Sequence, residues 1–486
     1  MPTPANADPM EDLPLLDLDA TAQAALVRSG QATPDDLLDA AIARIERLNP
    51  GLNALSAEDV EAARKRAHAL DTAAPFAGVP TLLKDLLAYP SQPFGLGSRL
   101  MQGQVAPAGS PYTEALDAAG LIVLGRTTTS EFGLVGTTEA LATGVTRNPW
   151  GPSRSTGGSS GGAAAAVASG MVPVAHASDG GGSIRGPSSL CGVFGFKPTR
   201  WRTRSAGLPR EMPLAAILSE HCISRTVRDS ATWLRVTEAE DWETPLPEAK
   251  ALAASPPAPL RIGYYRIDAF GNAPDVAASA ALERTVALCR SLGHVVVPVG
   301  GPAFDGPKAS RAVYDVMAMT TAGMVAFLAP GLAPEAAAAS LEPYTLALIA
   351  HARGLPPERF AEAAGEIAAA GTAAQAALDG VDMLLSPTIP FTAFPLGTVS
   401  PDCPPETIRR HFERSAAFTA AASLAGWPAM SVPLHWSAEG LPAGSHFAAR
   451  AGEDALLLRL AFQLEKAAPW APRLLALSRT LACRRS

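Results

Sequence analysis

The chain has 486 residues, of which 48% are hydrophobic and 17% are charged, which is ample for a large buried core. Its formal net charge is −7 at pH 7 and it has no dense block of Lys and Arg, so nucleic acids and anionic membrane surfaces are excluded as expected partners. Five widely spaced cysteines form no CxxC pair, which excludes a zinc ribbon and a thiol redox motif. We expect no metal and no cofactor.

Residues 1–19 carry acidic residues and prolines but no apolar stretch, so they do not resemble a signal peptide and we expect a flexible N-terminal lead. The longest apolar runs fall short of the about 18 residues that a membrane-spanning helix needs. We therefore expect a soluble, cytoplasmic protein with no membrane partner. No feature of residues 20–486 requires two independently folding domains, and we expect a single domain there.

Two helices are predicted near the N-terminus. Residues 21–28 predict a short helix that stops at Gly30. Thr33 is a suitable N-cap and Pro34 suits the first helical turn, and apolar residues at helical spacing follow them. We expect this second helix to end at residues 49–51, Asn-Pro-Gly.

The rest of the chain alternates between helical patterns and short apolar runs. We predict strands at residues 79–87, 120–125, 260–264, 294–298, 383–385 and 429–433. We predict helices at residues 112–119, 163–169, 275–292, 357–378 and 454–464. Helix followed by strand is the order of an α/β protein, so we expect a sheet covered by helices.

Two glycine-dense loops hold a serine each, Ser159 in residues 157–162 and Ser183 in residues 179–185. Glycine permits a close approach of the backbone but weakens ordinary helices and strands. Two such loops so near each other indicate that the backbone itself is used. One such use is to aim N–H groups at a negative charge that develops beside a nucleophilic hydroxyl.

The first loop alone also matches G-x-S-x-G, the nucleophile elbow of α/β-hydrolases, with Ser159 as nucleophile. That elbow follows a central strand directly, whereas residues 148–155 contain two prolines and cannot form one. A phosphate-binding P-loop is excluded because no Lys-Ser or Lys-Thr follows the glycines. The spacing of a dinucleotide-binding fingerprint is missing as well.

Read together with a lysine upstream, the loops belong to a longer pattern. Five segments follow one another, at residues 79–85, 148–150, 157–162, 179–185 and 195–199. Their order resembles the amidase signature family, hydrolases with a Ser–cis-Ser–Lys triad, over about residues 20–475. The resemblance implies an α/β fold in which helices cover both faces of a large mixed central β-sheet. It further implies a catalytic core at about residues 65–215 and a substrate-shaping part at about residues 300–400.

The resemblance assigns the catalytic roles to three residues. Ser183 would be the nucleophile and Lys84 the base, while Ser159 would relay protons between them and follow Gly158 through a cis peptide bond. The oxyanion hole would consist of the backbone N–H groups of Gly180, Gly181, Gly182 and Ser183. Three supporting side chains would stabilise the loops by hydrogen bonds, namely Ser160, Asp179 and Arg185.

Elementary chemistry makes the same demands on Lys84. A serine hydroxyl is a poor nucleophile without a neighbouring base, and lysine is a base only when it is neutral. Its ordinary pKa of about 10.4 must fall by roughly two to three units, at about 1.36 kcal/mol per unit, and desolvation can supply this. The neighbours Leu82, Leu83, Leu86 and Leu87 are apolar. Asp85 would point to the opposite face of a strand and need not pair with Lys84.

Residues 76–80 and 464–470 resemble the bacterial branch with cyclic nylon-oligomer hydrolases, aryl acylamidases and urethanases. This likeness implies an acyl-enzyme mechanism on apolar or aryl amides, and also on carbamates and esters, by a monomer or homodimer. We expect residues 300–355 to hold the specificity segment. Its candidate pocket residues are flexible and apolar, namely Tyr314, Met317, Met319, Met324, Phe327 and Tyr344.

Two alternatives stay open. A-type subunits of amidotransferases share the signature and release ammonia from glutamine within a complex. A catalytically silent binding protein is the other alternative, and the intact set of Lys84, Ser159 and Ser183 argues against it.

Overall fold

The computed structural model describes residues 13–483. Its centre is a mixed sheet of eleven strands in the order β1-β3-β2-β8-β10-β9-β14-β15-β13-β11-β12. The strands are β1 Leu55–Glu58, β2 Pro80–Lys84, β3 Ile122–Thr127, β8 Val174–Asp179, β9 Phe194–Lys197, β10 Ser219–Ser224, β11 Arg261–Tyr264, β12 Val295–Pro298, β13 Met383–Pro387, β14 Ala429–Trp436 and β15 Pro442–Ala449. Two small ladders pair β4 Glu139–Ala140 with β5 Gly144–Val145, and β6 Arg147–Asn148 with β7 Gly151–Ser155.

The sheet has parallel strands near both ends and antiparallel strands in the middle. β2 runs parallel to β3 and β8, and β11 runs parallel to β12 and β13. β10 pairs antiparallel with both β8 and β9, which continues the sheet towards β14 and β15. The expected large mixed sheet is therefore confirmed.

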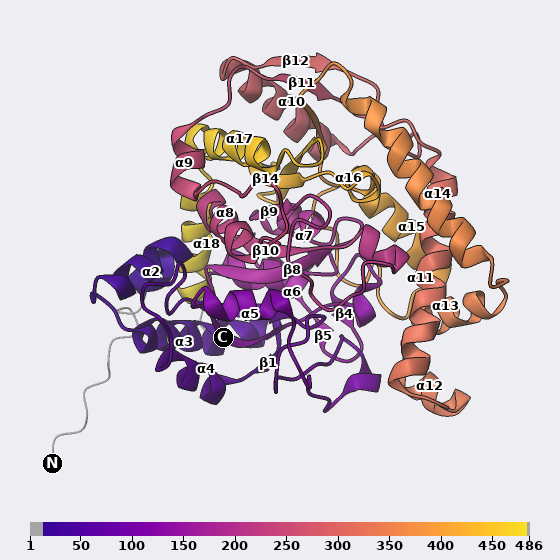
Figure 1. Ribbon diagram of the computed structural model, residues 1–486, viewed down its shortest axis with the longest axis horizontal. Helices are drawn as coiled ribbons and strands as arrows, with labels where there is room; N and C mark the ends of the chain where they lie inside the picture. The colour runs from indigo at the N-terminus through magenta and orange to yellow at the C-terminus, as the bar shows by residue number, and fades with distance from the viewer. Residues whose placement is uncertain (1–12, 484–486) are drawn as a thin grey trace.

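Helices surround this sheet (Figure 1). They are α1 Leu13–Asp17, α2 Ala20–Arg28, α3 Pro34–Leu52, α4 Val60–Ala67, α5 Pro111–Ala118, α6 Gly161–Ser169, α7 Arg185–Cys191, α8 Val227–Thr237, α9 Ala249–Ala254, α10 Val276–Ser291, α11 Gly306–Leu328, α12 Pro334–Ser340, α13 Pro343–Arg353, α14 Arg359–Ala374, α15 Pro405–Ala416, α16 Ala420–Ala425, α17 Asp454–Ala467 and α18 Ala471–Cys483. Short 3-10 helices lie at Arg99–Met101, Glu131–Gly133, Pro213–Ala216 and Gln375–Leu378. Among the described residues, none of these helices combines the length and apolar character needed to cross a membrane.

Both faces of the sheet are buried. In β2, Leu82 belongs to the largest hydrophobic cluster and its neighbour Leu83 to a second one. In β13, Met383 packs into the largest cluster and Leu384 into a third. Since successive strand residues point to opposite faces, helices and loops must cover both sides, as expected for this fold.

The second predicted helix extends further than its sequence suggested. α3 continues through Pro50 to Leu52, so the expected stop at residues 49–51 is wrong. Asn53 ends the helix in a left-handed conformation, and the side chain of Asn49 accepts the N–H groups of Ala54 and Leu55 at 2.8 and 3.0 Å. Burial of Leu52 adds to this cap, and together they offset the tendency of a proline to break a helix.

The expected flexible lead needs a partial correction. Its residues 1–12 lie outside the described residues, but Leu13–Asp17 form α1 and Asp19 caps α2. Leu16 is buried and its carbonyl oxygen accepts a hydrogen bond from Arg225. A long-range contact that no local pattern reveals therefore orders this segment.

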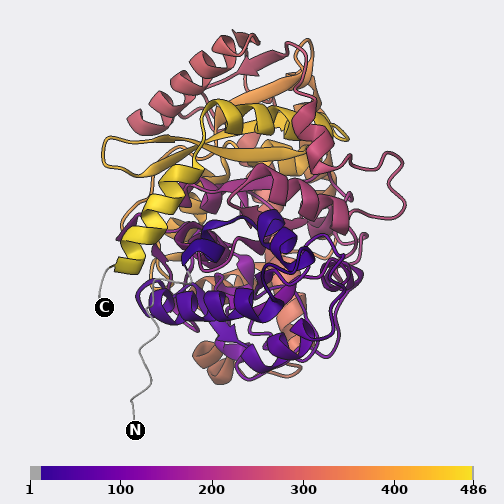
Figure 2. The ribbon, with the colours of Figure 1, turned by 90° about the vertical axis from the view of Figure 1, so that its left-hand side faces the viewer.

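The two ends of the described chain pack together. α18 lies beside α3 and α6, and Figure 2 shows this yellow helix next to the indigo N-terminal helices. Arg44 of α3 donates a hydrogen bond to Ser478, and Arg479 pairs with Asp17 at 2.7 Å. Helices α11 to α14 lie on one flank of the molecule (Figure 1), where α14 packs against α16 and α13 against α15.

Candidate active site

Lys84 lies at the carboxyl end of β2 and is completely buried. Its Nζ is 2.8 Å from Ser159 Oγ and 3.0 Å from Ser178 Oγ. Burial lowers the pKa of this lysine from 10.5 to about 7, although the charges of Glu220 and Asp179 oppose the shift. The amine is therefore neutral in a large fraction of molecules near neutral pH, as a proton acceptor must be.

The first glycine loop brings Ser159 to this amine. The peptide bond between Gly158 and Ser159 is cis. A Cβ at Gly158 would lie 2.3 Å from the carbonyl oxygen of Thr137, so only glycine fits there. Ser160 donates a hydrogen bond of 3.2 Å to the carbonyl oxygen of Ser178, which ties this loop to the end of β8.

The second glycine loop leaves β8 and is held by a buried ion pair. Arg185 Nη2 donates to Asp179 Oδ1 at 2.8 Å, and both side chains are fully buried. Burial would raise the pKa of Asp179, but the charge and hydrogen bonds of Arg185 prevail and lower it to about 2. Asp179 Oδ2 also accepts the N–H groups of Ile184 and Arg185 at 3.1 and 3.3 Å. This carboxylate therefore closes the loop around Ser183.

The loop leaves a row of backbone donors without protein acceptors. Among residues 13–483, the N–H groups of Gly180, Gly181, Gly182 and Ser183 donate to no other residue. Gly182 has φ of +137°, a backbone conformation open to glycine, and Thr419 donates to the carbonyl oxygen of Gly181 at 2.5 Å. The free N–H groups fit the expected position of an oxyanion hole.

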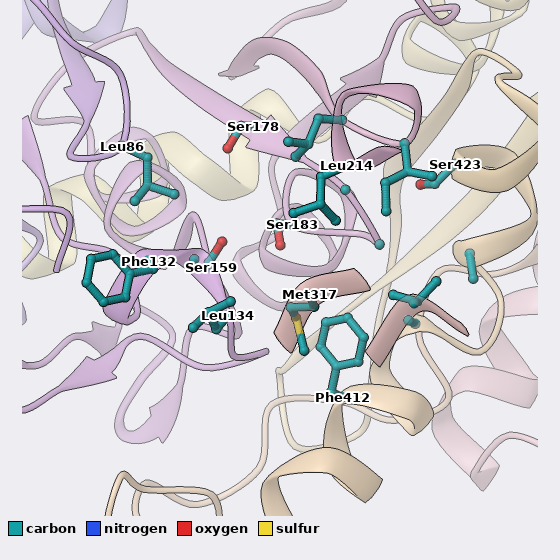
Figure 3. A pocket seen from close by; sticks show the side chains of 18 of the residues that line it. Leu86, Phe132, Leu134, Ser159, Ser178, Ser183, Leu214, Met317, Phe412 and Ser423 are labelled. Carbon is teal, nitrogen blue, oxygen red and sulfur yellow. The ribbon is translucent and has the colours of Figure 1, made fainter. Parts of the chain in front are cut away.

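Ser159, Ser178 and Ser183 line one cavity of about 520 Å³ (Figure 3). The hydroxyl of Ser183 forms no hydrogen bond with any described residue. Ser183 and Ser159 therefore line the same cavity without a hydrogen bond between them. Catalytic hydrogen bonds are often long in unliganded enzymes and shorten when substrate binds. The structure therefore brings together the three predicted side chains. Lys84 and Ser159 are hydrogen-bonded, whereas Ser159 and Ser183 are not.

The cavity wall is mostly apolar and comes from many parts of the chain. Of the six predicted pocket residues, Met317 and Met324 line the cavity. Phe327 is 82% exposed, and Tyr344 is buried in a cluster beside Met317. Aromatic residues that the sequence did not single out complete the wall, namely Phe94, Phe132, Phe270, Phe304 and Phe412. They come from segments that lie far apart in the sequence, so no local pattern marks them as members of one cavity wall.

Polar residues on three strands of the central sheet, β8, β10 and β15, were also missed. His176 Nδ1 accepts the backbone N–H of Lys84 at 3.3 Å, and its Nε2 lies 2.9 Å from a carboxylate oxygen of Glu220. His446 lies 3.0 Å from Arg185 Nη1, which places a second unassigned histidine beside the buried ion pair.

The arrangement does not fit the nucleophile elbow. The strand before Ser159 is β7, which belongs to a small two-stranded ladder and not to the central sheet. The contact of the Ser159 hydroxyl is a lysine instead of a histidine. Among the described residues, no group of His, Cys, Asp and Glu side chains could hold a metal ion.

Known proteins share this sequence and fold over nearly the whole chain. The family model Amidase matches residues 36–458. The 6-aminohexanoate-cyclic-dimer hydrolase of Pseudomonas sp. (strain NK87) is 33% identical over 474 residues, which cover 94% of this chain and 96% of that one. The A-type subunit of the glutamyl-tRNA(Gln) amidotransferase of Synechococcus sp. (strain WH7803) is 35% identical over 478 residues, covering 90% and 95%. The structure of a bacterial aryl acylamidase is 28% identical with a TM-score of 0.87, covering 97% and 100%.

Proposed function

The protein belongs to the amidase signature family of amide hydrolases, and we propose that it cleaves the C–N bond of apolar or aryl amides through an acyl-enzyme on Ser183. One observation carries the proposal. The amine of Lys84 is fully buried, has a pKa lowered to about 7 by burial, and lies 2.8 Å from Ser159 Oγ in the wall of the cavity that also holds Ser183.

In the proposed mechanism, Ser183 Oγ attacks the carbonyl carbon of the amide. Its proton passes to Ser159 while the proton of Ser159 passes to Lys84. The same relay then runs in reverse and protonates the nitrogen of the leaving amine, so that the C–N bond breaks and the acyl group stays on Ser183. A water molecule, activated by the same relay, hydrolyses the ester and restores the serine.

The oxyanion of the tetrahedral intermediate would bind to the row of backbone N–H groups at residues 180–183. These donors have no acceptor among the described residues, and Asp179 and Arg185 hold the loop in place. Donors that are already oriented act without reorganisation at the moment of reaction, and removal of one such donor from a serine hydrolase costs about 3–4 kcal/mol.

The apolar cavity supports an apolar acyl or aryl group as substrate. The names of two relatives, a 6-aminohexanoate-cyclic-dimer hydrolase and an aryl acylamidase, agree with this class. We extend the proposal to carbamates and esters because their carbonyl carbons are attacked through the same intermediate. A single polypeptide in solution, as a monomer or homodimer, would suffice.

The amidotransferase alternative has sequence relatives but less support from the cavity. Glutamine carries a free carboxylate, which a binding site matches with a cationic side chain. Among the described residues, the cavity wall contains no Lys, Arg or His. A pocket that is apolar and has Glu220 and Glu413 in its wall fits a neutral amide better.

The purified chain alone tests the proposal. We expect it to release p-nitroaniline from p-nitroacetanilide and nitrophenol from a nitrophenyl carbamate and a nitrophenyl ester, and not to release ammonia from glutamine. Inactivity of the single chain on all three substrates, with glutaminase activity after a partner chain is added, would favour the amidotransferase alternative.

A further inference from the structure

Glu220 is the residue of β10 that faces the substrate cavity. It lies opposite Ser178 in the antiparallel pairing of β10 with β8, directly beside the hydroxyl that contacts Lys84. Its side chain forms part of the cavity wall and is 23% exposed. A carboxylate in a largely apolar wall is costly unless it is solvated or paired, so its partners decide what the cavity presents to a substrate.

The partner of Glu220 carries no positive charge. One carboxylate oxygen is 2.9 Å from His176 Nε2. His176 is completely buried, and burial lowers its pKa. Because its Nδ1 accepts the backbone N–H of Lys84, the neutral ring carries its proton on Nε2 and donates it to Glu220. Its other carboxylate oxygen, Oε1, has no hydrogen-bond partner among residues 13–483.

The second acidic residue of the wall is neutralised. Glu413 Oε1 accepts a hydrogen bond from Ser310 at 2.5 Å and lies 3.3 Å from Arg409 Nε. Glu220 has no such cation. In the form that accepts a proton, Lys84 is uncharged as well, so the reactive enzyme presents one negative charge without a paired cation in the wall of the cavity that also holds Ser183.

We propose that the carboxylate of Glu220 makes this cavity select amides that are neutral or positively charged and reject amides that carry a carboxylate. The inference rests on the amide hydrolysis proposed above and narrows its substrate class. A substrate ammonium group could donate to Glu220 Oε1 in place of water. A substrate carboxylate would meet a like charge in a cavity whose wall lacks Lys, Arg and His among the described residues.

Two matched series of substrates test the selectivity, one for each side of the scissile bond. The acyl series consists of the p-nitroanilides of 5-aminopentanoic, pentanoic and glutaric acid. The amine series consists of acetanilides with a para aminomethyl, methyl or carboxylate group. In at least one series, we expect kcat/KM of the anionic member to be about tenfold or more below that of the neutral member, as expected for like charges at close range.

Glu220→Gln and Glu413→Gln form a matched pair of variants, because each removes one charge of the wall without changing the size of the side chain. We expect Glu220→Gln to reduce the preference for the neutral over the anionic substrate by about tenfold, and Glu413→Gln to change it less than about threefold. The readout is a ratio between substrates that use the same base. Any effect of Glu220→Gln on Lys84 therefore cancels.

The outcomes separate this inference from the proposed function. If the neutral anilides are not cleaved at all, the proposed amide hydrolysis itself fails. If neutral and anionic members are cleaved alike in both series, or if Glu413→Gln changes the ratio as much as Glu220→Gln, the inference is overturned while amide hydrolysis stands. The ratio in the unaltered enzyme decides the case even when a variant does not fold.

Discussion

Ser159 and Ser183 both stand in glycine-rich loops of the same cavity, but only Ser159 contacts the buried lysine. We expect Ser183→Ala to abolish covalent labelling by a fluorophosphonate, because it removes the oxygen that forms the bond. Ser159→Ala should retain slow labelling at Ser183, because it removes the relay and not the nucleophile. Intact-protein and peptide mass spectrometry measure both. Labelling of Ser159 in the Ser183→Ala variant would restore the nucleophile-elbow interpretation.

The base should be visible in the dependence of activity on pH. The pKa of Lys84 is lowered to about 7 by burial, and only the neutral amine accepts a proton. We therefore expect kcat/KM to rise with pH through about 7 and then to level off, and Lys84→Ala to lower kcat by about 10²–10⁴-fold, the typical share of a general base. Stopped or continuous assays from pH 5.5 to 9 give the profile.

Lys197 is the matched control for that profile. It too is buried, burial lowers its pKa to about 7, and its Nζ donates to the carbonyl oxygen of Pro198 at 2.8 Å. Lys197→Met should keep the rise in activity near pH 7. If Lys197→Met lost the rise, the titrating group would be Lys197 and not Lys84.

Lys84, Ser159 and Ser183 were predicted from the sequence because each stands in a segment that resembles part of the family signature, and the structure places all three at one cavity. The sequence did not identify Ser178, His176 or Glu220. Their proximity to Lys84 results from the pairing of β2, β8 and β10, and nothing local in the sequence specifies which strands become neighbours.

The predicted elements show the same limit. The apolar runs of β2 and β3 were recognised, whereas β8 and β10, at the middle of the sheet, were not. Both are fully or nearly fully buried but carry His176, Ser178, His221 and Ser224. Apolar periodicity is the main signal for a strand, and the buried polar residues of β8 and β10 interrupt it.

The second glycine loop, residues 179–185, is held by the buried pair of Arg185 and Asp179. Arg185→Met leaves the carboxylate of Asp179 buried without a counter-charge, which typically costs about 3–5 kcal/mol, and should lower kcat more than it raises KM. Arg410 is the matched control, since its pair with Glu406 is exposed. Arg410→Met should change the free energy of unfolding by less than about 1 kcal/mol. Urea denaturation of both variants measures the difference, and equal losses would show that the loop does not rely on the pair.

For the whole molecule, a buried lysine that must be neutral lowers stability. The pKa of Lys84 is about 7 in the folded protein and about 10.4 in an unfolded chain. Between these values the unfolded chain binds more protons than the folded one, so this group makes the free energy of unfolding rise with pH. The resulting loss in the free energy of unfolding is greatest at pH 7 and below, and it becomes smaller as the pH increases towards 10.

Lys84→Met removes both this destabilising effect of the buried amine and the proposed base. We therefore expect an inactive variant that is more stable than the parent enzyme, with a gain about 1–2 kcal/mol larger at pH 7 than at pH 8.5, since the slope approaches about 1.4 kcal/mol per pH unit above the folded pKa. Cys191, whose pKa burial raises, is present in both proteins, so its contribution to the pH dependence cancels in the difference between them. Denaturation of both proteins at pH 7 and pH 8.5 measures this gain. Lys250→Met is the control, because Lys250 is exposed. A gain that is absent, or the same at both pH values, would mean that the folded enzyme keeps Lys84 protonated, and the lysine could then not accept the proton of the serine relay.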